Sequence, residues 1–209
     1  MLNYDQQKRI LDLLVAFALM IVFLPFWLIL PVLIIISDGF PIFFSHQRVG
    51  KDGQKFAIKK FRSMVNNAHE ILHKQDPKLL EKFKKGDWKF PANEDPRITK
   101  LGKVLRALTI DEFPQLFNVI KGEMSMIGPR AYMQEELDEQ TRKYPETKKY
   151  VKAILSIKPG ITGPWQTSGR NEIPFVQRAK MDAEYAKTKN IWNDIRIILR
   201  TPKAMISKW

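Results

Sequence analysis

The chain has 209 residues and a formal net charge of +13, because 35 Lys and Arg residues outnumber 22 Asp and Glu residues. It contains no cysteine, which excludes a disulfide scaffold, thiol catalysis and a cysteine-ligated zinc site. A chain of this length typically forms one domain with accessory segments, and the excess positive charge indicates an anionic partner such as a membrane surface, a nucleic acid or a phosphorylated substrate.

The first predicted element is an uncharged run of 24 residues from Leu13 to Ile36, which could cross a bilayer as a straight helix. Pro25 lies near its middle, and an internal proline removes a backbone hydrogen bond and kinks a helix. Two arms of about twelve residues reach only ~18 Å each, less than the ~30 Å hydrocarbon core. Because basic residues flank both ends, we predict a re-entrant membrane anchor in residues 1–40, with a single span as the alternative.

Residues 41–209 are predicted to form a second unit, which starts with a β-hairpin. Apolar residues flank Asp52-Gly53, a dipeptide that is a strong signal for a hairpin turn. The basic segment Lys59–Met64 follows and contains Lys60 and Arg62. It is either a solvated face or part of a site that binds an anion.

A charged helical stretch is predicted from Ala68 to Phe83, interrupted at Pro77, and is typical of a solvated surface insertion. Within it, His69, Glu70 and His73 form the pattern HEILH. In zinc proteases two histidines one helical turn apart bind the metal beside a glutamate base. No further histidine follows in the sequence, so a third ligand would have to be a carboxylate.

The next predicted helix leads into an adjacent acid pair. From Ile98 to Leu108, apolar residues share one helical face and basic residues, including Arg106, share the other. Asp111 and Glu112 follow, and Pro114 predicts the opening of another helix, whose amino end and dipole favour negative charge. We expect a carboxylate there to stay ionised at neutral pH, as a nucleophile or a magnesium ligand requires, although acids at helix starts are usually only caps.

Downstream of the acid pair, Arg130 and the loop Lys158–Asn171 add groups suited to phosphate. Glycines in the loop let backbone amides approach an anion closely, Arg170 can grip a phosphate, and Gln166 could meet a base or a sugar. The alternative is an ordinary tight turn around a buried Trp165.

The closing segment, residues 191–209, predicts an amphipathic helix that lies either in a membrane interface or on the core. Its apolar stripe contains Ile191, Trp192, Ile195, Ile198, Leu199, Met205, Ile206 and Trp209. The fold class expected for the whole chain is α+β and mainly helical. It combines a re-entrant membrane helix, a small β-hairpin and amphipathic interfacial helices around a compact catalytic domain.

The ordered blocks of the sequence resemble the bacterial sugar transferases, the monotopic polyprenol-phosphate phosphoglycosyl transferases, and most closely their undecaprenyl-phosphate hexose-1-phosphate transferase branch. The resemblance runs through the proline-broken anchor, KKFRSM, EDPRITKLGKVLR, DEFPQLFNVIKGEMSMIGPR, KPGITGPWQTSGRNEI and the final helix. It implies that Asp111 is the nucleophile, that Glu112 is its partner and that both bind Mg²⁺. It also places substrate-binding groups at the positions Lys60, Arg62, Arg106, Arg130, Gln166 and Arg170.

The resemblance further implies the reaction and its location. The expected partners are a UDP-sugar, polyprenol (undecaprenyl) phosphate and the membrane, with no nucleic acid. Sugar-1-phosphate would pass to the lipid through a covalent aspartyl intermediate with release of UMP, on the cytoplasmic face of the bacterial inner membrane. Because the chain starts at the anchor, it is similar to the minimal catalytic unit of the family. The alternatives are a membrane-associated zinc metalloprotease using HEILH and a non-enzymatic basic membrane adaptor.

Overall fold

The computed structural model describes residues 2–88, 90, 94–169 and 172–206. The chain opens with α1 (Tyr4–Val22), which starts where Asn3 and Gln6 form a capping box: each side chain accepts a hydrogen bond from the other residue's backbone N–H. Such a box satisfies amides that the first helical turn leaves free. The helix ends at Phe23, and α2 (Leu24–Asp38) follows with Pro25 in its first turn. The predicted break near Pro25 is therefore confirmed.

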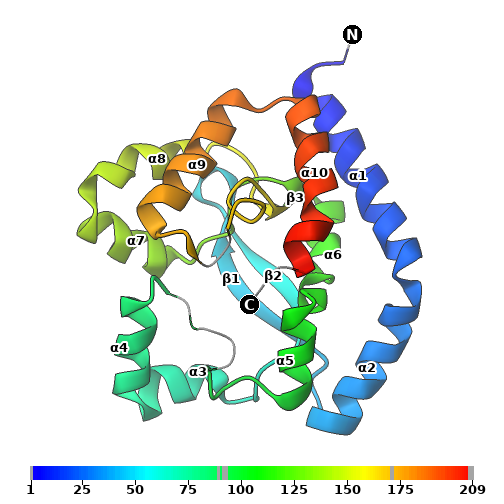
Figure 1. The fold of residues 1–209 in the computed structure, drawn as a ribbon, viewed down its shortest axis with the longest axis vertical. Helices are drawn as coiled ribbons and strands as arrows, with labels where there is room; N and C mark the ends of the chain where they lie inside the picture. The colour runs from blue at the N-terminus through cyan, green and yellow to red at the C-terminus, as the bar shows by residue number, and fades with distance from the viewer. Residues whose placement is uncertain (1, 89, 91–93, 170–171, 207–209) are drawn as a thin grey trace.

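The two helices of the predicted anchor are bent by 62° at the break and run along one side of the molecule (Figure 1). Neither helix is by itself long and apolar enough to cross a membrane, whereas the bent pair meets that requirement of length and composition. Large apolar side chains such as Phe17, Ile21, Leu28 and Ile36 are exposed on the pair. The anchor therefore presents an apolar surface to its surroundings.

Polar side chains near the start of α1 fasten the anchor to the rest of the chain. Asp12 is buried and accepts hydrogen bonds from Lys8, from the Ser125 hydroxyl and from the Met126 amide. Arg9 donates to the carbonyl oxygens of Val119 and Ile120 at 2.6 and 2.7 Å. These carbonyls lie at the end of a helix, where backbone acceptors lack helical partners and attract positive charge.

The predicted hairpin is confirmed. Strand β1 (Phe43–Val49) pairs in antiparallel register with β2 (Lys55–Phe61) through the short 3₁₀ turn η1 (Lys51–Gly53). The turn works because Asp52 and Gly53 both adopt positive φ, 55° and 77°, the conformation that Asp and Gly tolerate best. In the register, Lys60 lies opposite Phe44 and Arg48 lies opposite Phe56.

The predicted insertion consists of three short helical pieces on the side of the molecule away from α1 (Figure 1). They are α3 (Ala68–Glu70), the π-helical turn η2 (Ile71–Gln75) and α4 (Pro77–Lys85). The interruption at Pro77 is confirmed, and the Asp76 side chain caps the new helix by accepting from the Leu79 amide.

Two helices and a turn carry the acid pair. Helix α5 (Lys100–Ala107) is capped by the Thr99 hydroxyl, the turn η3 (Ile110–Glu112) follows, and α6 (Gln115–Lys121) ends at Gly122. Leu105 on the predicted apolar face of α5 is buried, whereas Leu108 is exposed. The predicted face is thus buried in its middle and open at its end.

The remaining elements close the fold around a second sheet, which the sequence pattern did not predict. They are β3 (Ser125–Ile127), α7 (Gln134–Lys143), η4 (Pro145–Thr147), α8 (Lys148–Ile154), β4 (Gly160–Thr162), α9 (Phe175–Thr188) and α10 (Ile191–Ile206). Strands β3 and β4 pair in parallel. With three residues each, they are too short for an alternation of apolar and polar residues to mark them as strands.

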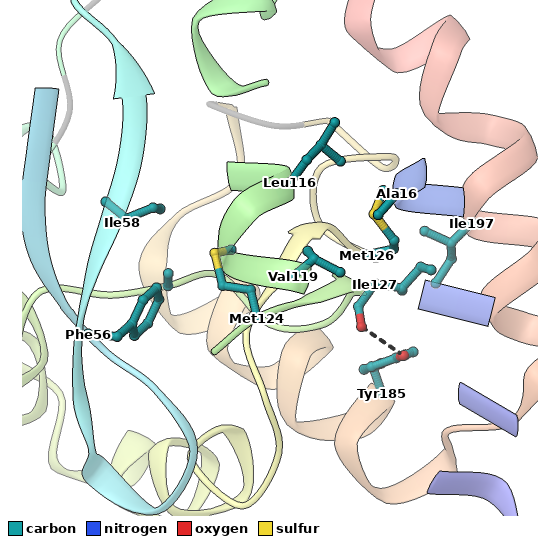
Figure 2. Close-up of a cluster of buried hydrophobic side chains, with 11 residues drawn as sticks. Ala16, Phe56, Ile58, Leu116, Val119, Met124, Met126, Ile127, Tyr185 and Ile197 are labelled. Carbon is teal, nitrogen blue, oxygen red and sulfur yellow. Dashed lines mark hydrogen bonds between the residues drawn. The ribbon is translucent and has the colours of Figure 1, made fainter. Parts of the chain in front are cut away.

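Figure 2 shows the main core, in which side chains from the anchor, the hairpin and the later helices meet. Ala16 of α1 packs in the same buried cluster as Phe56 of β2, Val119 of α6 and Ile197 of α10. The hydroxyl of the buried Tyr185 donates to the carbonyl oxygen of Ile127. The predicted anchor and the unit that follows it therefore share one core.

Helix α10 lies beside α1 (Figure 1) and divides the predicted apolar stripe. Trp192 and Leu199 are 76% and 74% exposed, whereas Ile198 packs against the core. Asp194 is fully buried and accepts hydrogen bonds from the hydroxyls of Tyr4 and Tyr185. The helix is thus docked on the domain and still carries two exposed apolar side chains; Trp209 lies outside the described residues.

Candidate active site

The acid pair lies in its own 3₁₀ turn rather than in the first turn of the following helix. Thr109 adopts the left-handed conformation, with φ 58°, and reverses the chain after α5. Asp111 is then buried, at 3% exposure, and the Glu112 side chain keeps 25%. Because α6 begins only at Gln115, the predicted support from the helix dipole is weaker than the sequence indicated.

Lys60 is the cation that lies directly against both acids. Its Nζ is 2.6 Å from Glu112 Oε1 and 3.9 Å from Asp111 Oδ2. The lysine comes from the second strand of the hairpin, far from the acids in sequence. The fold therefore assembles a carboxylate pair and an ammonium group in a half-buried site.

Arg106 is the second cation near Asp111, and a close helix contact holds it in place. A Cβ added to Gly102 would lie 2.0 Å from the Ser63 carbonyl oxygen, so only glycine lets α5 approach this segment so closely. One helical turn later, Arg106 Nε donates to the Ser63 hydroxyl at 2.9 Å. Ser63 of the KKFRSM segment thus orients a guanidinium that acts electrostatically on Asp111.

Burial controls the charge of Asp111. Its pKa is raised to about 6, because removal from water and then the negative charge of Glu112 favour the protonated form, while Lys60 and Arg106 oppose the shift. The expectation that the helix end alone would keep this carboxylate ionised is thus modified. At pH 7 Asp111 is still mostly ionised, and it is a more basic oxygen than an exposed aspartate.

The predicted magnesium ligands are the carboxylate oxygens of Asp111 and Glu112. Asp111 Oδ1 is buried without a hydrogen-bond partner, and hard carboxylate oxygens are the ligands that Mg²⁺ prefers. Across the described ranges, no group of three or more His, Cys, Asp or Glu residues is arranged to hold a metal. Mg²⁺ is commonly held by one or two carboxylates, water and substrate phosphates, so Asp111 and Glu112 fit that mode.

Arg130 lies in a second cationic group that is built around a tryptophan. The guanidinium carbons of Arg130 and Arg178 are each 5.6 Å from the centre of the Trp165 ring. Trp165 is buried and interacts with both guanidinium groups through its π-face. The expected burial of the tryptophan is confirmed, and its ring also contacts the guanidinium of Arg130.

Asp182 and Gln166 belong to the same part of the site as Arg130 and Trp165. Asp182, on α9, accepts a hydrogen bond from the Arg130 backbone N–H at 3.1 Å. Burial raises the pKa of Asp182 to about 7, against the opposing effects of Arg130 and Arg178. The Gln166 side-chain oxygen is buried without a partner among the described residues, so it stays a candidate substrate-binding group.

Arg62, another predicted substrate-binding residue, is placed away from the acid pair. Arg62 is buried and donates to the carbonyl oxygens of Gly39 and Phe40 and to the Asn66 side chain. Its contacts hold the residues that follow α2. Arg170 lies outside the described residues.

Sequence analysis missed Arg48. This residue connects the hairpin that carries Lys60 to the segment that follows Arg130. Its Nη1 donates to the Ala131 carbonyl oxygen at 3.3 Å, one residue after Arg130. The available signal was the period of a strand: Arg48 is on β1, at a register position that shares a hairpin face with Lys60.

The HEILH pattern does not form a zinc-protease centre in the described part of the chain. The rings of His69 and His73 lie 4.3 Å apart, but they have no third protein ligand within the described residues. The two histidines sit on the exposed insertion, as the solvated-surface prediction has it.

The sequence of nearly the whole chain matches known proteins. A family model for bacterial sugar transferases matches residues 3–208. The chain is 38% identical over 204 residues to the undecaprenyl-phosphate galactose phosphotransferase of Salmonella typhimurium, covering 96% of this chain and 40% of that protein. It is 36% identical over 203 residues to an exopolysaccharide production protein, ExoY, of Rhizobium meliloti, covering 95% and 84%.

A third relative is the UDP-glucose:undecaprenyl-phosphate glucose-1-phosphate transferase of Caulobacter vibrioides. It is 32% identical over 208 residues, which cover 97% of this chain and 71% of that protein. The chain spans about 40% of the length of the Salmonella relative.

Proposed function

The chain belongs to the bacterial sugar transferase family, and from this premise we propose that it transfers a sugar-1-phosphate from a UDP-sugar to polyprenol (undecaprenyl) phosphate and releases UMP. Two of the named relatives act on undecaprenyl phosphate by name, and one of these uses UDP-glucose. The observation that carries the proposal is the environment of Asp111. It is a buried carboxylate with one unpartnered oxygen, beside Lys60 and Arg106.

The proposed reaction divides one displacement into two. An oxygen of Asp111 attacks the phosphorus that bears the sugar, the bond from this phosphorus to the oxygen bridging the diphosphate breaks, and UMP leaves with that oxygen. A phosphate oxygen of the polyprenol phosphate then attacks the same phosphorus and displaces Asp111. The product is a polyprenol-diphosphate sugar, and the carboxylate is regenerated.

Lys60 and Arg106 stabilise negative charge that develops on the phosphoryl oxygens in both steps. Lys60 also keeps Asp111 ionised, because its ammonium lowers the pKa of that carboxyl. Glu112 anchors Lys60 at 2.6 Å. When Mg²⁺ is bound by Asp111 and Glu112, it supplies further neutralisation of the diphosphate.

The anchor would hold the catalytic unit at the membrane surface. We propose that α1 and α2 form a re-entrant hairpin in the cytoplasmic leaflet of the bacterial inner membrane, with the catalytic unit on the cytoplasmic face. The bend of 62° and the exposed apolar side chains support this arrangement. A site at the depth of the lipid headgroups can receive both a soluble nucleotide sugar and a lipid phosphate.

A turnover assay tests the function. The full chain, in detergent or lipid, should release UMP from at least one UDP-sugar when polyprenol phosphate and Mg²⁺ are present. Asp111→Asn should lose turnover, while Asp138→Asn, an exposed aspartate of α7, should retain it. Wild-type protein that releases no UMP from a full panel of UDP-sugars would contradict the proposal.

The covalent step can be tested separately. With a UDP-sugar and no lipid acceptor, intact-protein mass spectrometry should show the mass of one added sugar phosphate. The adduct should be absent from Asp111→Asn and present in Asp138→Asn. An adduct on another residue would show that this residue, and not Asp111, is the nucleophile. Turnover without any adduct would indicate a single direct displacement.

A further inference from the structure

We propose that Arg48, together with Arg130, binds the nucleotide-side phosphate of the donor, the phosphate that leaves as part of UMP. This inference rests on the proposed transferase function. It adds a substrate-binding residue and divides the cations of the site between the two phosphates. Lys60 and Arg106 would serve the phosphate attacked by Asp111, and the two other arginines would serve the leaving one.

The hairpin places Arg48 and Lys60 on the same face. Lys60 is paired with Phe44, and Arg48 follows Phe44 by four positions on the same strand. Alternate residues of a strand point to the same side of the sheet, and paired residues share that side. Arg48 is therefore about 13 Å along the strand from the level of Lys60, at ~3.3 Å per residue. Two long side chains can reach one bound diphosphate across that separation.

The contacts of Arg48 bring it to Arg130. Its Nη1 donates to the carbonyl oxygen of Ala131, and the next amide along the strand, that of Val49, donates to the carbonyl oxygen of Tyr132 at 2.9 Å. These two bonds join the end of β1 to the segment that follows Arg130. The second cationic group is therefore attached to the hairpin that carries Lys60.

Both guanidinium groups keep an unused donor. The Nε atoms of Arg48 and Arg130 are buried and have no hydrogen-bond partner among the described residues. A buried donor without an acceptor is costly, and a charged one is more costly still. An arriving phosphate would supply acceptor oxygens and negative charge to both.

The electrostatics of Arg48 agree with this placement. Burial and the nearby Arg130 guanidinium lower the pKa of Arg48 to about 10, whereas Glu136 and Glu112 raise it. Arg48 thus repels Arg130 and is attracted by Glu136 and by Glu112 of the acid pair. An anion lying between these groups would relieve the repulsion.

The geometry of phosphoryl transfer assigns which phosphate lies there. The attacking and leaving oxygens are roughly in line through phosphorus. The leaving phosphate is therefore on the side of the attacked phosphorus that faces away from Asp111. Lys60 lies 3.9 Å from Asp111 Oδ2, whereas Arg48 lies about 13 Å along the hairpin from the level of Lys60. The leaving phosphate fits the more distant pair.

Binding of the product UMP tests the proposal without turnover. Titration calorimetry of the full chain would compare UMP with uridine, which has the same nucleoside and no phosphate. Arg48→Met keeps much of the apolar stem and removes the charge. It should weaken UMP binding roughly tenfold to a hundredfold, as expected for the loss of a charged hydrogen bond, and leave uridine binding unchanged.

Two further variants complete the test. Arg48→Lys should recover part of the preference for UMP over uridine, because it restores the charge. Arg142→Met, which removes an exposed arginine of α7, should bind both compounds as the wild type does. Equal UMP binding by Arg48→Met and wild type would overturn the proposal. So would an equal loss for UMP and uridine, which would indicate general damage to the site.

The two proposals can fail separately. Wild-type protein that turns over UDP-sugar, with an Arg48→Met variant that binds UMP normally, would preserve the transferase and refute the role of Arg48. Conversely, the wild-type protein could bind UMP in a way that depends on Arg48 and yet release no UMP from any UDP-sugar. That result would support the role of Arg48 and refute the transferase.

Discussion

The ring of Phe23, at the break of the anchor, lies 4.6 Å from the ring of Phe113, centre to centre, and Phe113 directly follows the acid pair. The ring of Phe26, in the first turn of α2, also lies near that of Phe113, with their centres 6.5 Å apart. The point at which the anchor bends is therefore packed against the turn that carries Asp111. Because the anchor sets the depth of the protein in the bilayer under the proposed function, this contact transmits that depth to the active site.

Loss of this contact should impair the use of the lipid substrate. Phe113→Ala should lower turnover by about tenfold to a hundredfold, since small misplacements of reacting groups are costly. The KM for the UDP-sugar should change little. Steady-state kinetics with each substrate varied in turn provide the measurement, with Phe83→Ala, a ring of the insertion, as the control. A change confined to the UDP-sugar KM would contradict this role.

Turnover should rise with pH through the titration of Asp111. The nucleophile must be an anion, and its pKa is raised to about 6 by burial. Activity should therefore be low at pH 5 and approach a plateau above pH 7. The pH profile of kcat/KM for the UDP-sugar would show this acid limb. A limb near pH 4 would mean that Asp111 ionises like an exposed aspartate.

Lys60→Met should move that limb to higher pH. Lys60 is the largest influence that lowers the pKa of Asp111, so its removal leaves burial and Glu112 less opposed. Turnover at pH 7 should fall and recover in part as the pH is raised. The same pH profile measures the shift, with Lys103→Met, an exposed lysine of α5, as the control. Lower activity with an unshifted pH profile would show that Lys60 binds substrate but does not set the pKa of Asp111.

Asp111→Asn should stabilise the fold at neutral pH while it abolishes turnover. The pKa of Asp111 is higher in the folded protein than the ordinary value of 3.8. The folded state therefore holds the proton more tightly, and the stability contributed by this residue falls as the pH rises from below 4 to above 6. Thermal unfolding should show a gain for the variant at pH 8 that shrinks towards pH 4. A difference in thermal stability that does not change with pH would show that the gain does not come from the ionisation of Asp111.

Asn118 should be important for stability. It is fully buried. Its Nδ2 donates to the Ala57 carbonyl oxygen at 2.9 Å, and its Oδ1 accepts from the Lys59 amide at 3.1 Å. Asn118→Leu would leave these backbone groups of β2 unpaired and should cost about 2–5 kcal/mol in the free energy of unfolding. Denaturant unfolding measures it, and Asn67→Leu, at an exposed residue just before α3, is the comparison.

The topology of the anchor can be read by chemical labelling, because the chain has no cysteine of its own. For a re-entrant hairpin, single cysteines at Gln7 and Asp52 should both react with a membrane-impermeant thiol reagent added to the cytoplasmic side. A cysteine at the exposed Ile21 should be protected by lipid. Labelling of Gln7 and Asp52 from opposite sides would show a single span instead.

Much of the fold follows from local sequence patterns. The break at Pro25, the turn at Asp52-Gly53 and the interruption at Pro77 depend on residues whose own backbone preferences decide the conformation. The short parallel pair β3–β4 depends instead on contact between segments more than thirty residues apart, which no local period reveals. Likewise, burial of Asp194 and Ile197 of α10 was decided by the surface on which the helix packs.

By itself, the sequence determined that an acid pair would lie near cations, because Asp111, Glu112 and Arg106 are close along the chain. Only the tertiary structure decided which cations reach them. The hairpin brings in Lys60 and aligns Arg48, while the end of the anchor takes Arg62. The pKa of Asp111 was also decided in three dimensions, because it depends on removal from water. Burial is a property of the packed fold and cannot be read from the order of neighbouring residues.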